Sequence, residues 1–391
     1  MINIFSKIFN NKDSKNFYFS DFENLNKITN IEKIFNLFSN FSETSEIRYV
    51  GGSIRKIINK EKVDDIDLAT NITPKIVCEI LRKNNISFYE SGIEHGTITA
   101  KINNYKFEIT TLRKDVSTDG RHAEVRFSKN WKEDALRRDF TINSIYSDKD
   151  GNLFDPLNGK KDLENGFVNF IGEPSTRIKE DYLRILRYIR FFLNYSKMKN
   201  NLEIIKKIKL NIYGIEKLSK ERLLDELKKI TKINILEKLS KDDTALNLIS
   251  IVFPELKNIK IFSKLTSDQR EILRKSDFIF LLSLMIIDES DNADYFLYKF
   301  KVSKKEKERI KIIDDFFKEK VNKKTFIESN LNRVLYYHGR EAVLDILNFR
   351  IIKLRKYDGN LIELKELFQN KLIPNMPVKA DLLMNKYQIP E

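Results

Sequence analysis

The sequence is poor in the residues that build disulfide frameworks and zinc sites. Its single cysteine, Cys78, excludes an internal disulfide and a cysteine-based zinc cluster. The three histidines, His95, His122 and His338, lie far apart in the chain, which argues against a histidine-rich metal site. The longest strongly apolar run, 278–287, is too short to cross a bilayer, which requires about 20 residues.

The first residues do not have the pattern of a secretory signal, so we expect none. Residues 1–20 mix charged side chains with Phe and Asn, and no sustained apolar stretch leads to a small-residue cleavage site. With one cysteine and no apolar span, we expect a cytoplasmic protein with no membrane partner. The sequence leaves the oligomeric state open.

The composition that is present predicts a folded, basic protein. Apolar residues make up 41% and charged residues 33% of 391 residues, enough for a core and for two to four domains. The net charge is +14, of which +2 falls in residues 1–150 and +12 in residues 151–391. A positive second part favours a polyanionic partner such as nucleic acid, although a solvated lysine surface on helices gives the same count.

Periodicity divides the chain into a mixed first part and a helical second part. We expect strands at 47–50, 65–69, 97–102 and 106–112, helices at 31–41, 53–60, 73–84 and 131–143, and helices almost throughout from about 179. Polar residues 115–124, with a turn signal at Asp119-Gly120, predict a mobile loop. The fold class is therefore α+β, with a small mixed sheet followed by helices.

Two carboxylates on one expected strand are the first indication of a catalytic metal site. Asp65 and Asp67 flank Ile66, so on a strand both acidic side chains share one face and can hold a divalent metal. A pair of Mg²⁺ ions can activate a hydroxyl and stabilise departing pyrophosphate. The same spacing recurs at Asp148 and Asp150, but the following Gly-Asn predicts a turn with solvated charges.

A glycine turn precedes this strand. Gly51, Gly52 and Ser53 stand where the expected strand 47–50 passes into a helix, with Ser53 as the expected N-cap. Glycines let the backbone approach a phosphate, and Arg55 can bind a triphosphate oxygen. An ordinary turn is the alternative for the glycines alone. A phosphate cradle followed by two strand carboxylates describes a nucleotidyltransferase head.

A third carboxylate, Glu108, lies on the expected strand 106–112. If this strand neighbours 65–69, Glu108 completes the metal site. If it does not, Glu108 is a solvent-facing residue of an edge strand.

These residues resemble the class II tRNA nucleotidyltransferases (CCA-adding enzymes) and the bacterial poly(A) polymerases. Segments similar to motifs of that family occur in order at 50–55 with 65–70, 92–97, 108–113, 115–121, 137–143, 180–187 and 221–223. One departure is Lys56, which stands where the family usually has Asp. The resemblance spans about residues 45–230.

The resemblance implies a reaction and a domain plan. It implies template-independent addition of C, C and A to the tRNA 3′ end from CTP and ATP, with Mg²⁺ as cofactor and tRNA as partner. The implied domains are a lead-in at 1–30, a nucleotidyltransferase head at 31–160, a neck at 161–235, and a tRNA-binding body and tail at 236–391.

The resemblance also assigns residues to the nucleotide. Arg138, Asp139 and Asn143 resemble the ribose site, and segment 180–187 resembles a base-reading helix. At positions i and i+3 of a helix, Asp181 and Arg184 share a face and match the donors and acceptors of C and A but not of U and G.

Arg187, one turn further on, can bind phosphate or brace Asp181. A surface salt bridge is the alternative for the whole segment. The alternative functions are poly(A) polymerase, an A-adding enzyme, and a non-catalytic RNA-binding protein on the same scaffold.

Overall fold

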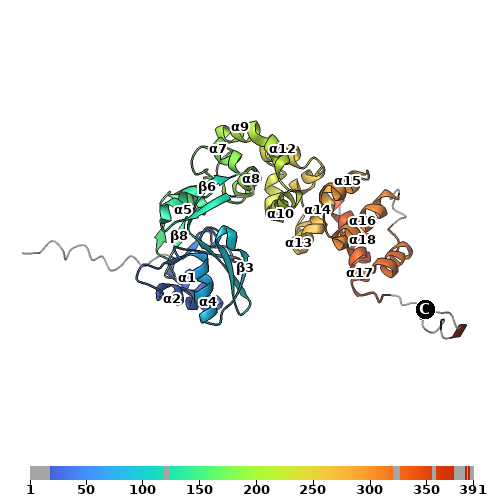
Figure 1. Ribbon diagram of the computed structural model, residues 1–391. Helices are drawn as coiled ribbons and strands as arrows, with labels where there is room; N and C mark the ends of the chain where they lie inside the picture. Colours follow the sequence, from blue (N-terminus) through green and yellow to red (C-terminus); the bar gives the residue numbers. More distant parts are fainter. Residues whose placement is uncertain are drawn as a thin grey trace, which may run out of the picture. The chain divides into compact units, whose positions relative to one another are not determined.

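The computed structural model describes residues 18–118, 123–319, 326–354 and 358–373, together with 384, 386 and 387. The chain divides into two compact units, one ending at Glu216 and one beginning at Lys217. The first unit combines a sheet with helices, and the second is helical in its described parts (Figure 1). This confirms the expected α+β class.

A seven-stranded mixed sheet forms the centre of the first unit. Its strands lie in the order β3 (Ser87–Gly92), β4 (Thr97–Ile102), β5 (Tyr105–Thr111), β2 (Ile66–Thr70), β1 (Ile47–Val50), β8 (Tyr146–Ser147) and β9 (Leu153–Phe154). The β2–β5 pair is parallel and the other pairs are antiparallel. The parallel pair places the strand expected to carry Asp67 beside the strand expected to carry Glu108.

One face of this sheet carries the main core. Ile66 and Leu68 of β2 and Phe107 and Ile109 of β5 are buried in a cluster with apolar side chains of four helices. These helices are α1 (Phe19–Thr29), α2 (Glu32–Ser39), α3 (Gly52–Ile58) and α4 (Pro74–Lys83). Because side chains alternate along a strand, Asp67 and Glu108 belong to the opposite face.

The N-terminal part is more ordered than the lead-in expected for residues 1–30. Residues 1–17 lie outside the described chain, but α1 is a formed helix whose Phe22 is fully buried. Asn26 of α1 accepts a hydrogen bond of 2.5 Å from the Tyr49 hydroxyl of β1. Helix α1 is therefore part of the core of the first unit.

Segment 113–127 is a two-stranded ribbon where a loop was expected over 115–124. Strands β6 (Arg113–Thr118) and β7 (Ala123–Phe127) pair antiparallel, with Asp115 opposite Val125. The backbone hydrogen bonds of a ribbon do not require alternating apolar side chains. The polar sequence of this segment therefore gave no sign of the two strands. Residues 119–122, which include Gly120, Arg121 and His122, lie outside the described residues.

Helix α5 (Trp131–Arg137) is shorter than the helix expected over 131–143. Arg138 leaves the helix with φ −67° and ψ 166°, and a single turn of 3-10 helix, η2, follows at Thr141–Asn143. Arg177 explains the end of the helix, because its Nη2 donates to the carbonyls of Arg137 and Arg138. The backbone of Phe140 also pairs with Phe170 in an isolated β-bridge.

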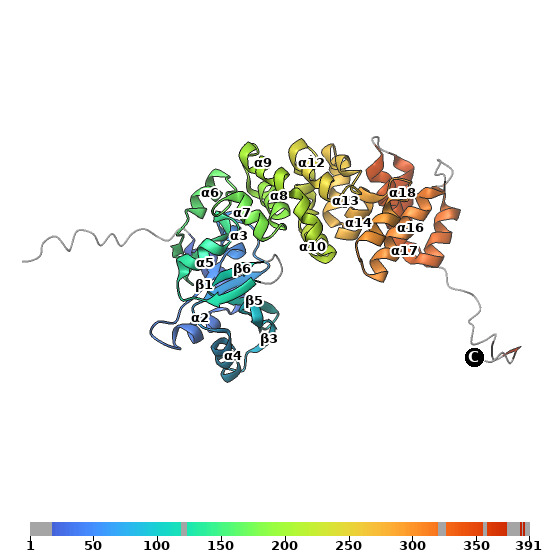
Figure 2. The same ribbon diagram turned by 45° about the horizontal axis from the view of Figure 1, so that its top comes forward.

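Helices complete the first unit. They are α6 (Gly159–Asn165), α7 (Pro174–Glu180), α8 (Arg184–Tyr195) and α9 (Leu202–Asn211) (Figure 2). A 3-10 helix, η3 (Ile212–Lys217), follows where the first unit ends and the second begins. The turn expected at 148–152 is confirmed: Asp148 Oδ1 accepts from the backbone N–H groups of Asp150 and Asn152, each at 2.9 Å.

The second unit is built from helices around an apolar core. They are α10 (Lys220–Ile230), α11 (Ile233–Leu239), α12 (Asp243–Val252), η4 (Ile259–Ser263), α13 (Ser267–Lys275), α14 (Phe278–Ile286), α15 (Asn292–Lys299), α16 (Lys304–Lys318), α17 (Glu328–Lys353) and α18 (Gly359–Asn370). Eight of the nine α14 residues, from Ile279 to Ile286, are buried. Among the described helices, none combines the length and apolar character that spanning a membrane requires.

Candidate active site

The two predicted strand carboxylates lie at the start of β2, on the face away from the main core. Asp65 directly precedes β2 and is exposed, while Asp67 is half-buried within it. Ile66 between them is buried in the core. The predicted alternation of acidic and apolar side chains is therefore present in the structure.

Glu108 is the direct neighbour of Asp67 on β5. Parallel pairing aligns Asp67 with Glu108, and Ile66 with Phe107 in the row before. Burial is the main reason that the pKa of Asp67 is raised; the charges of Glu108 and Asp65 add to the rise, and those of Arg138 and Arg55 oppose it. This edge of the sheet therefore concentrates negative charge.

The glycine turn lies against the same carboxylate. Gly51 has φ +63°, a conformation that side-chain-bearing residues rarely adopt, and its N–H donates to the Ile145 carbonyl at 3.1 Å. A Cβ added to Gly52 would stand 3.3 Å from Asp67 Oδ2. The bend expected to hold a triphosphate and the carboxylate expected to hold metal are thus adjacent.

Ser53 has a different place from the helix N-cap that the sequence predicts. Gly51 is the N-cap of α3, and Ser53 is fully buried inside the helix. Its hydroxyl donates to the Asp65 carbonyl at 3.1 Å and accepts from the Asp67 N–H at 3.2 Å. Ser53 therefore fixes the backbone on both sides of Ile66, which orients the two carboxylates.

Arg55 is buried under helix α8, with only 7% of its surface exposed. Its Nη1 donates to Asn143 Oδ1, and its guanidinium lies 4.7 Å from the Phe191 ring centroid and 5.0 Å from that of Tyr195. In the structure, Arg55 connects α3 to η2 and α8.

Asp139 and Asn143, two of the three residues predicted to bind the ribose, are hydrogen-bonded to each other. Asp139 Oδ1 accepts from Asn143 Nδ2 at 2.8 Å, and Asp139 Oδ2 accepts from Arg187 Nε at 2.6 Å. Burial alone raises the pKa of Asp139, but the charge of Arg187 and these hydrogen bonds outweigh it and hold the pKa well below its usual range. Arg187 braces Asp139, whereas the sequence suggested phosphate or Asp181 as its partner.

Asp181 and Arg184 do not lie on one helix, so the predicted i, i+3 face is wrong. Asp181 is the C-cap of α7, with φ −152° and ψ 105°, and α8 begins at Arg184. The Asp181 side chain accepts from the Leu183 N–H at 3.1 Å, a local bond that aspartate often makes where a helix is interrupted. Arg184 Nη1 donates to Glu180 Oε2 at 2.6 Å and to the Arg177 carbonyl at 2.7 Å.

Sequence reasoning missed Asp134, which lies at the centre of a cluster with Arg137, Arg138 and Tyr146. The signal was present in the spacing, because Asp134 precedes Arg137 by three residues and Arg138 by four. Tyr146 is remote in sequence and gave no signal.

The carboxylates fit a divalent cation. Asp65 and Asp67 offer oxygen ligands. Burial is the main reason that the pKa of Asp67 is raised, and the nearby carboxylates of Glu108 and Asp65 add to the rise, so a bound cation would stabilise the ionised form. Within the described residues no group of three or more metal-binding side chains converges, so Glu108 is not placed as a third ligand with Asp65 and Asp67. Two carboxylates suffice for Mg²⁺, which commonly completes its shell with water and substrate phosphates.

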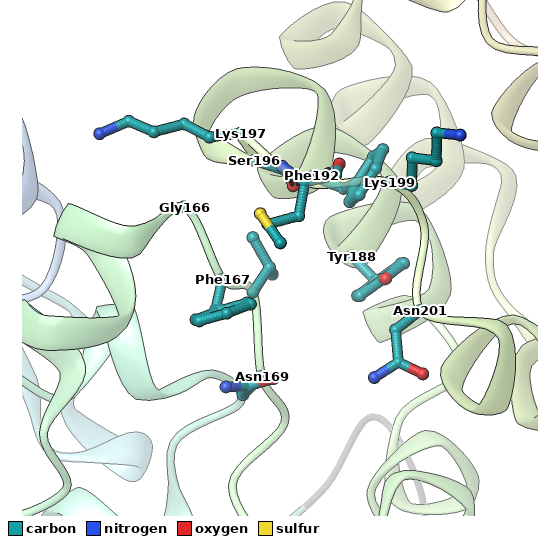
Figure 3. Close-up of a pocket in the computed structure, with 11 residues that line it drawn as sticks. Gly166, Phe167, Asn169, Tyr188, Phe192, Ser196, Lys197, Lys199 and Asn201 are labelled. Atoms are coloured by element: carbon teal, nitrogen blue, oxygen red, sulfur yellow. Dashed lines mark hydrogen bonds between the residues drawn. The ribbon is translucent and has the colours of Figure 1, made fainter.

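A separate pocket of about 560 Å³ lies beside α8. Tyr188, Phe192 and Phe167 line it, and Lys197 and Lys199 extend outward at its edge (Figure 3). None of its lining residues belongs to the predicted site.

Comparison with known proteins identifies the family to which the chain is similar. Residues 47–169 match the family model described as the poly A polymerase head domain. The human mitochondrial CCA tRNA nucleotidyltransferase 1 is 36% identical over 348 residues, which cover 86% of this chain and 77% of the human protein. The CCA-adding enzyme of Staphylococcus haemolyticus is 31% identical over 306 residues, covering 77% of this chain and 72% of that enzyme.

The fold agrees as well. The crystal structure of the Bacillus stearothermophilus CCA-adding enzyme in complex with CTP superimposes with a TM-score of 0.68 at 21% identity, covering 92% of this chain and 88% of that one. With an acidic strand edge, an adjoining glycine turn and relatives above 30% identity over most of their length, the chain belongs to the family of CCA-adding tRNA nucleotidyltransferases, which use divalent metal.

Proposed function

We propose that this protein adds C, C and A to the 3′ end of tRNA from CTP and ATP, without a nucleic-acid template. The observation that carries the proposal is that the Asp67 carboxylate lies beside the glycine turn, where a Cβ added to Gly52 would stand 3.3 Å from Asp67 Oδ2. It joins a phosphate-binding bend to a metal-binding side chain, which nucleotidyl transfer requires in one place. Membership of the family supports the choice of tRNA, CTP and ATP.

The reaction is a displacement at phosphorus. The terminal 3′ hydroxyl of tRNA attacks the α-phosphorus of the nucleotide, the α–β phosphoanhydride bond breaks, and pyrophosphate leaves. Mg²⁺, held by Asp65 and Asp67, would supply Lewis-acid activation of the hydroxyl and stabilise the charge on pyrophosphate. Glu108 adds negative charge beside these ligands and strengthens the attraction for the cation.

The remaining residues bind and orient the nucleotide. The Gly51–Gly52 bend admits the triphosphate close to the backbone, and Ser53 keeps Asp65 and Asp67 in register with it. Arg55 acts through Asn143, to which it donates.

The sugar and the base have their own residues in this proposal. Asp139 and Asn143, braced by Arg187, face the ribose. Arg138, which the resemblance also assigns to the ribose, has its Nη1 beside the Gly51 bend and is proposed below to face the triphosphate instead. Asp181 and Arg184 read the edge of the base, from the break between α7 and α8.

The rest of the chain serves tRNA in this proposal. The head includes α1 and runs to residue 160, residues 161–235 are the neck, and the body and tail, 236–391, bind tRNA. Support comes from the net charge of +12 in residues 151–391, because phosphate contacts dominate nucleic-acid affinity. We also propose a cytoplasmic location, since Cys78 is a free, buried thiol.

The test is incubation of the purified protein and Mg²⁺ with a tRNA that lacks its 3′ CCA. CTP, ATP and both are supplied separately, and the products are sequenced. The expected product with both nucleotides ends in CCA, and CTP alone gives CC. Long A tails with ATP alone would indicate a poly(A) polymerase, and extension only of tRNA already ending in CC would indicate an A-adding enzyme.

Variants identify the metal ligands. We expect Asp65→Asn and Asp67→Asn each to abolish incorporation while tRNA binding, measured by gel shift, is retained. Asp150→Asn is the matched control, because it alters the second Asp-x-Asp pair, which forms a turn. Retained incorporation in either site variant would discard the metal assignment, and binding without any incorporation in the wild type would indicate a non-catalytic RNA-binding protein.

A further inference from the structure

A buried carboxylate next to the proposed site is saturated with donors. Asp134 is 1% exposed. Its Oδ1 accepts from Arg137 Nε at 2.8 Å and from the Arg113 backbone N–H at 3.4 Å. Its Oδ2 accepts from Arg138 Nε at 3.1 Å, from Arg138 Nη2 at 3.0 Å and from the Tyr146 hydroxyl at 2.7 Å. Asp134 is therefore the centre of a buried, hydrogen-bonded cluster and is not one half of a surface ion pair.

The cluster holds one end of the Arg138 guanidinium and leaves the other end directed at the glycine turn. Nε and Nη2 are occupied by Asp134, and Nε also donates to the Tyr146 hydroxyl at 3.1 Å. Within the described part of the chain, the hydrogen bond of Nη1 is a long one, 3.5 Å, to the Asn143 carbonyl. A Cβ added to Gly51 would stand 3.6 Å from this same Nη1 atom.

The charges of the cluster do not cancel. Two guanidinium groups, Arg137 and Arg138, surround the single carboxylate of Asp134, and the Tyr146 hydroxyl is neutral because burial, the main cause, and Asp134 raise its pKa to well above the physiological range. One positive charge therefore remains, with Nη1 of Arg138 beside the Gly51 bend. A group of negative charge seated on that bend would meet a donor already in place.

We propose that Asp134 is a positioning residue for nucleotide binding, which fixes Arg138 so that Nη1 faces the triphosphate on the Gly51–Gly52 bend. Tyr146 is the second positioning residue, because its hydroxyl connects Arg138 Nε to Asp134 Oδ2. This inference rests on the proposed function. Arg138 contacts the nucleotide, and Asp134 and Tyr146 act only through Arg138.

Pre-positioning affects binding more than the chemical step. An arginine that already points at the triphosphate loses little side-chain freedom when the nucleotide arrives. Without Asp134, the guanidinium would have to be ordered by the nucleotide itself, which weakens binding. We therefore expect the Michaelis constant for the nucleotide to rise while kcat changes less.

The experiment is a double-mutant cycle on CTP incorporation into tRNA lacking CCA. The variants are Asp134→Asn, Arg138→Gln and the pair together, with KM for CTP, kcat and the melting temperature measured for each. Both single variants are expected to raise KM by about tenfold, the scale of one charge-assisted hydrogen bond. In the Arg138→Gln background, Asp134→Asn is expected to raise KM no further.

Two controls keep the result interpretable. Tyr146→Phe removes one hydroxyl and keeps the carboxylate, so it remains informative if Asp134→Asn does not fold; its KM increase is expected to be smaller and to vanish in the Arg138→Gln background. Asp345→Asn disrupts another buried carboxylate, which Arg309 binds at 2.7 Å in the second unit. It is expected to lower the melting temperature without changing KM for CTP.

Two outcomes would overturn the positioning role. One is that Asp134→Asn and Arg138→Gln raise KM for CTP independently, so that the double variant shows the product of the two increases. The other is that Asp134→Asn lowers the melting temperature and leaves KM unchanged. A failure of the proposed function itself looks different, because then the wild-type protein would not extend the tRNA at all.

Discussion

The Oδ2 atom of Asp67 lies so close to the Gly52 backbone that a Cβ at position 52 would stand 3.3 Å from it. The turn between β1 and α3 therefore lies next to the acidic edge of β2. A side chain added at position 52 would push against the Asp67 carboxylate, so substitutions there test the arrangement.

Gly52→Ala should separate activity from stability. Gly52 is within α3 and has no positive φ, so alanine suits the backbone and stabilises the helix by up to about 1 kcal/mol. The new Cβ displaces the Asp67 carboxylate by a few tenths of an ångström, so kcat for CTP incorporation should fall several-fold at an unchanged or higher melting temperature. Gly51→Ala is the contrast: its φ of +63° predicts loss of stability and activity together. Full activity of Gly52→Ala would show that the site accommodates a methyl group beside Asp67 Oδ2, which would contradict this prediction.

Asp67→Asn should stabilise the metal-free protein while it abolishes activity. The folded protein raises the pKa of Asp67, chiefly through burial, so the folded state binds this proton more tightly than the unfolded state. Stability is therefore lost as the pH rises from the ordinary aspartate pKa through the raised value. At pH 7 without metal, Asp67→Asn should melt higher than the wild type, and the difference should shrink as the pH falls toward 4 and below.

Thermal melts across this pH range in EDTA provide the measurement for Asp67. Asp150→Asn, at a half-exposed side chain in a turn, is the control and should change the melting temperature little. An Asp67→Asn protein that melts lower than the wild type at pH 7 would contradict the electrostatic account.

Arg187→Gln should destabilise the fold most at neutral pH. It removes the charge that holds Asp139 ionised, and the cost is about 1–3 kcal/mol. Because the pKa of Asp139 is lowered, the contribution of this pair is present above the ordinary aspartate pKa and is lost as the pH falls below it. Urea unfolding at pH 7 and at pH 3.5 measures the difference, and Arg190→Gln on the same helix is the control. An equal loss at both pH values would count against the pairing.

Arg55→Lys should lower stability more than it weakens nucleotide binding. Lysine cannot reproduce the planar contact with Phe191 and Tyr195 together with the hydrogen bond to Asn143, a loss of about 1–2 kcal/mol. Urea unfolding and KM for CTP are measured on the same preparation. The reverse pattern, an unchanged free energy of unfolding with a large rise in KM, would indicate the direct triphosphate contact that the sequence suggested.

Arg184→Ala should relax the choice of C and A over U and G. Glu180 and the Arg177 carbonyl hold Arg184 Nη1, so the guanidinium is oriented before a base arrives. Incorporation from each of the four nucleotides gives the ratios, with Glu180→Gln expected to give a milder loss of selectivity. Unchanged selectivity in Arg184→Ala would discard the base-reading role.

Local patterns predicted the acidic edge of the sheet because they depend on few residues. Alternation around Ile66 determines which face Asp65 and Asp67 occupy, and the Gly-Gly pair marks the turn. The pairing of β2 with β5, on which the role of Glu108 depended, was left open by the sequence because residues far apart in the chain decide it.

The errors arose where tertiary contacts overrule local preference. The sequence around Arg138–Asn143 is suited to a helix, but Arg177 binds the carbonyls at the end of α5 and Phe140 pairs with Phe170. Likewise, the helical pattern through 180–187 is broken at Asp181, whose side chain bonds its own backbone two residues on.

The parallel pairing of β2 with β5 has a consequence for how the active protein arises. Helix α4 and strands β3 and β4 lie between β2 and β5 in the chain, so Asp67 and Glu108 become neighbours only after this segment has folded. Closing such a long loop costs conformational entropy, which makes the contact slow to form. A slip of one residue in this pair would exchange Glu108 for Phe107 and put an apolar ring where the cation belongs. After dilution from denaturant, enzymatic activity should therefore recover more slowly than the helical circular dichroism signal, because β2 and β5 pair after the helices have formed.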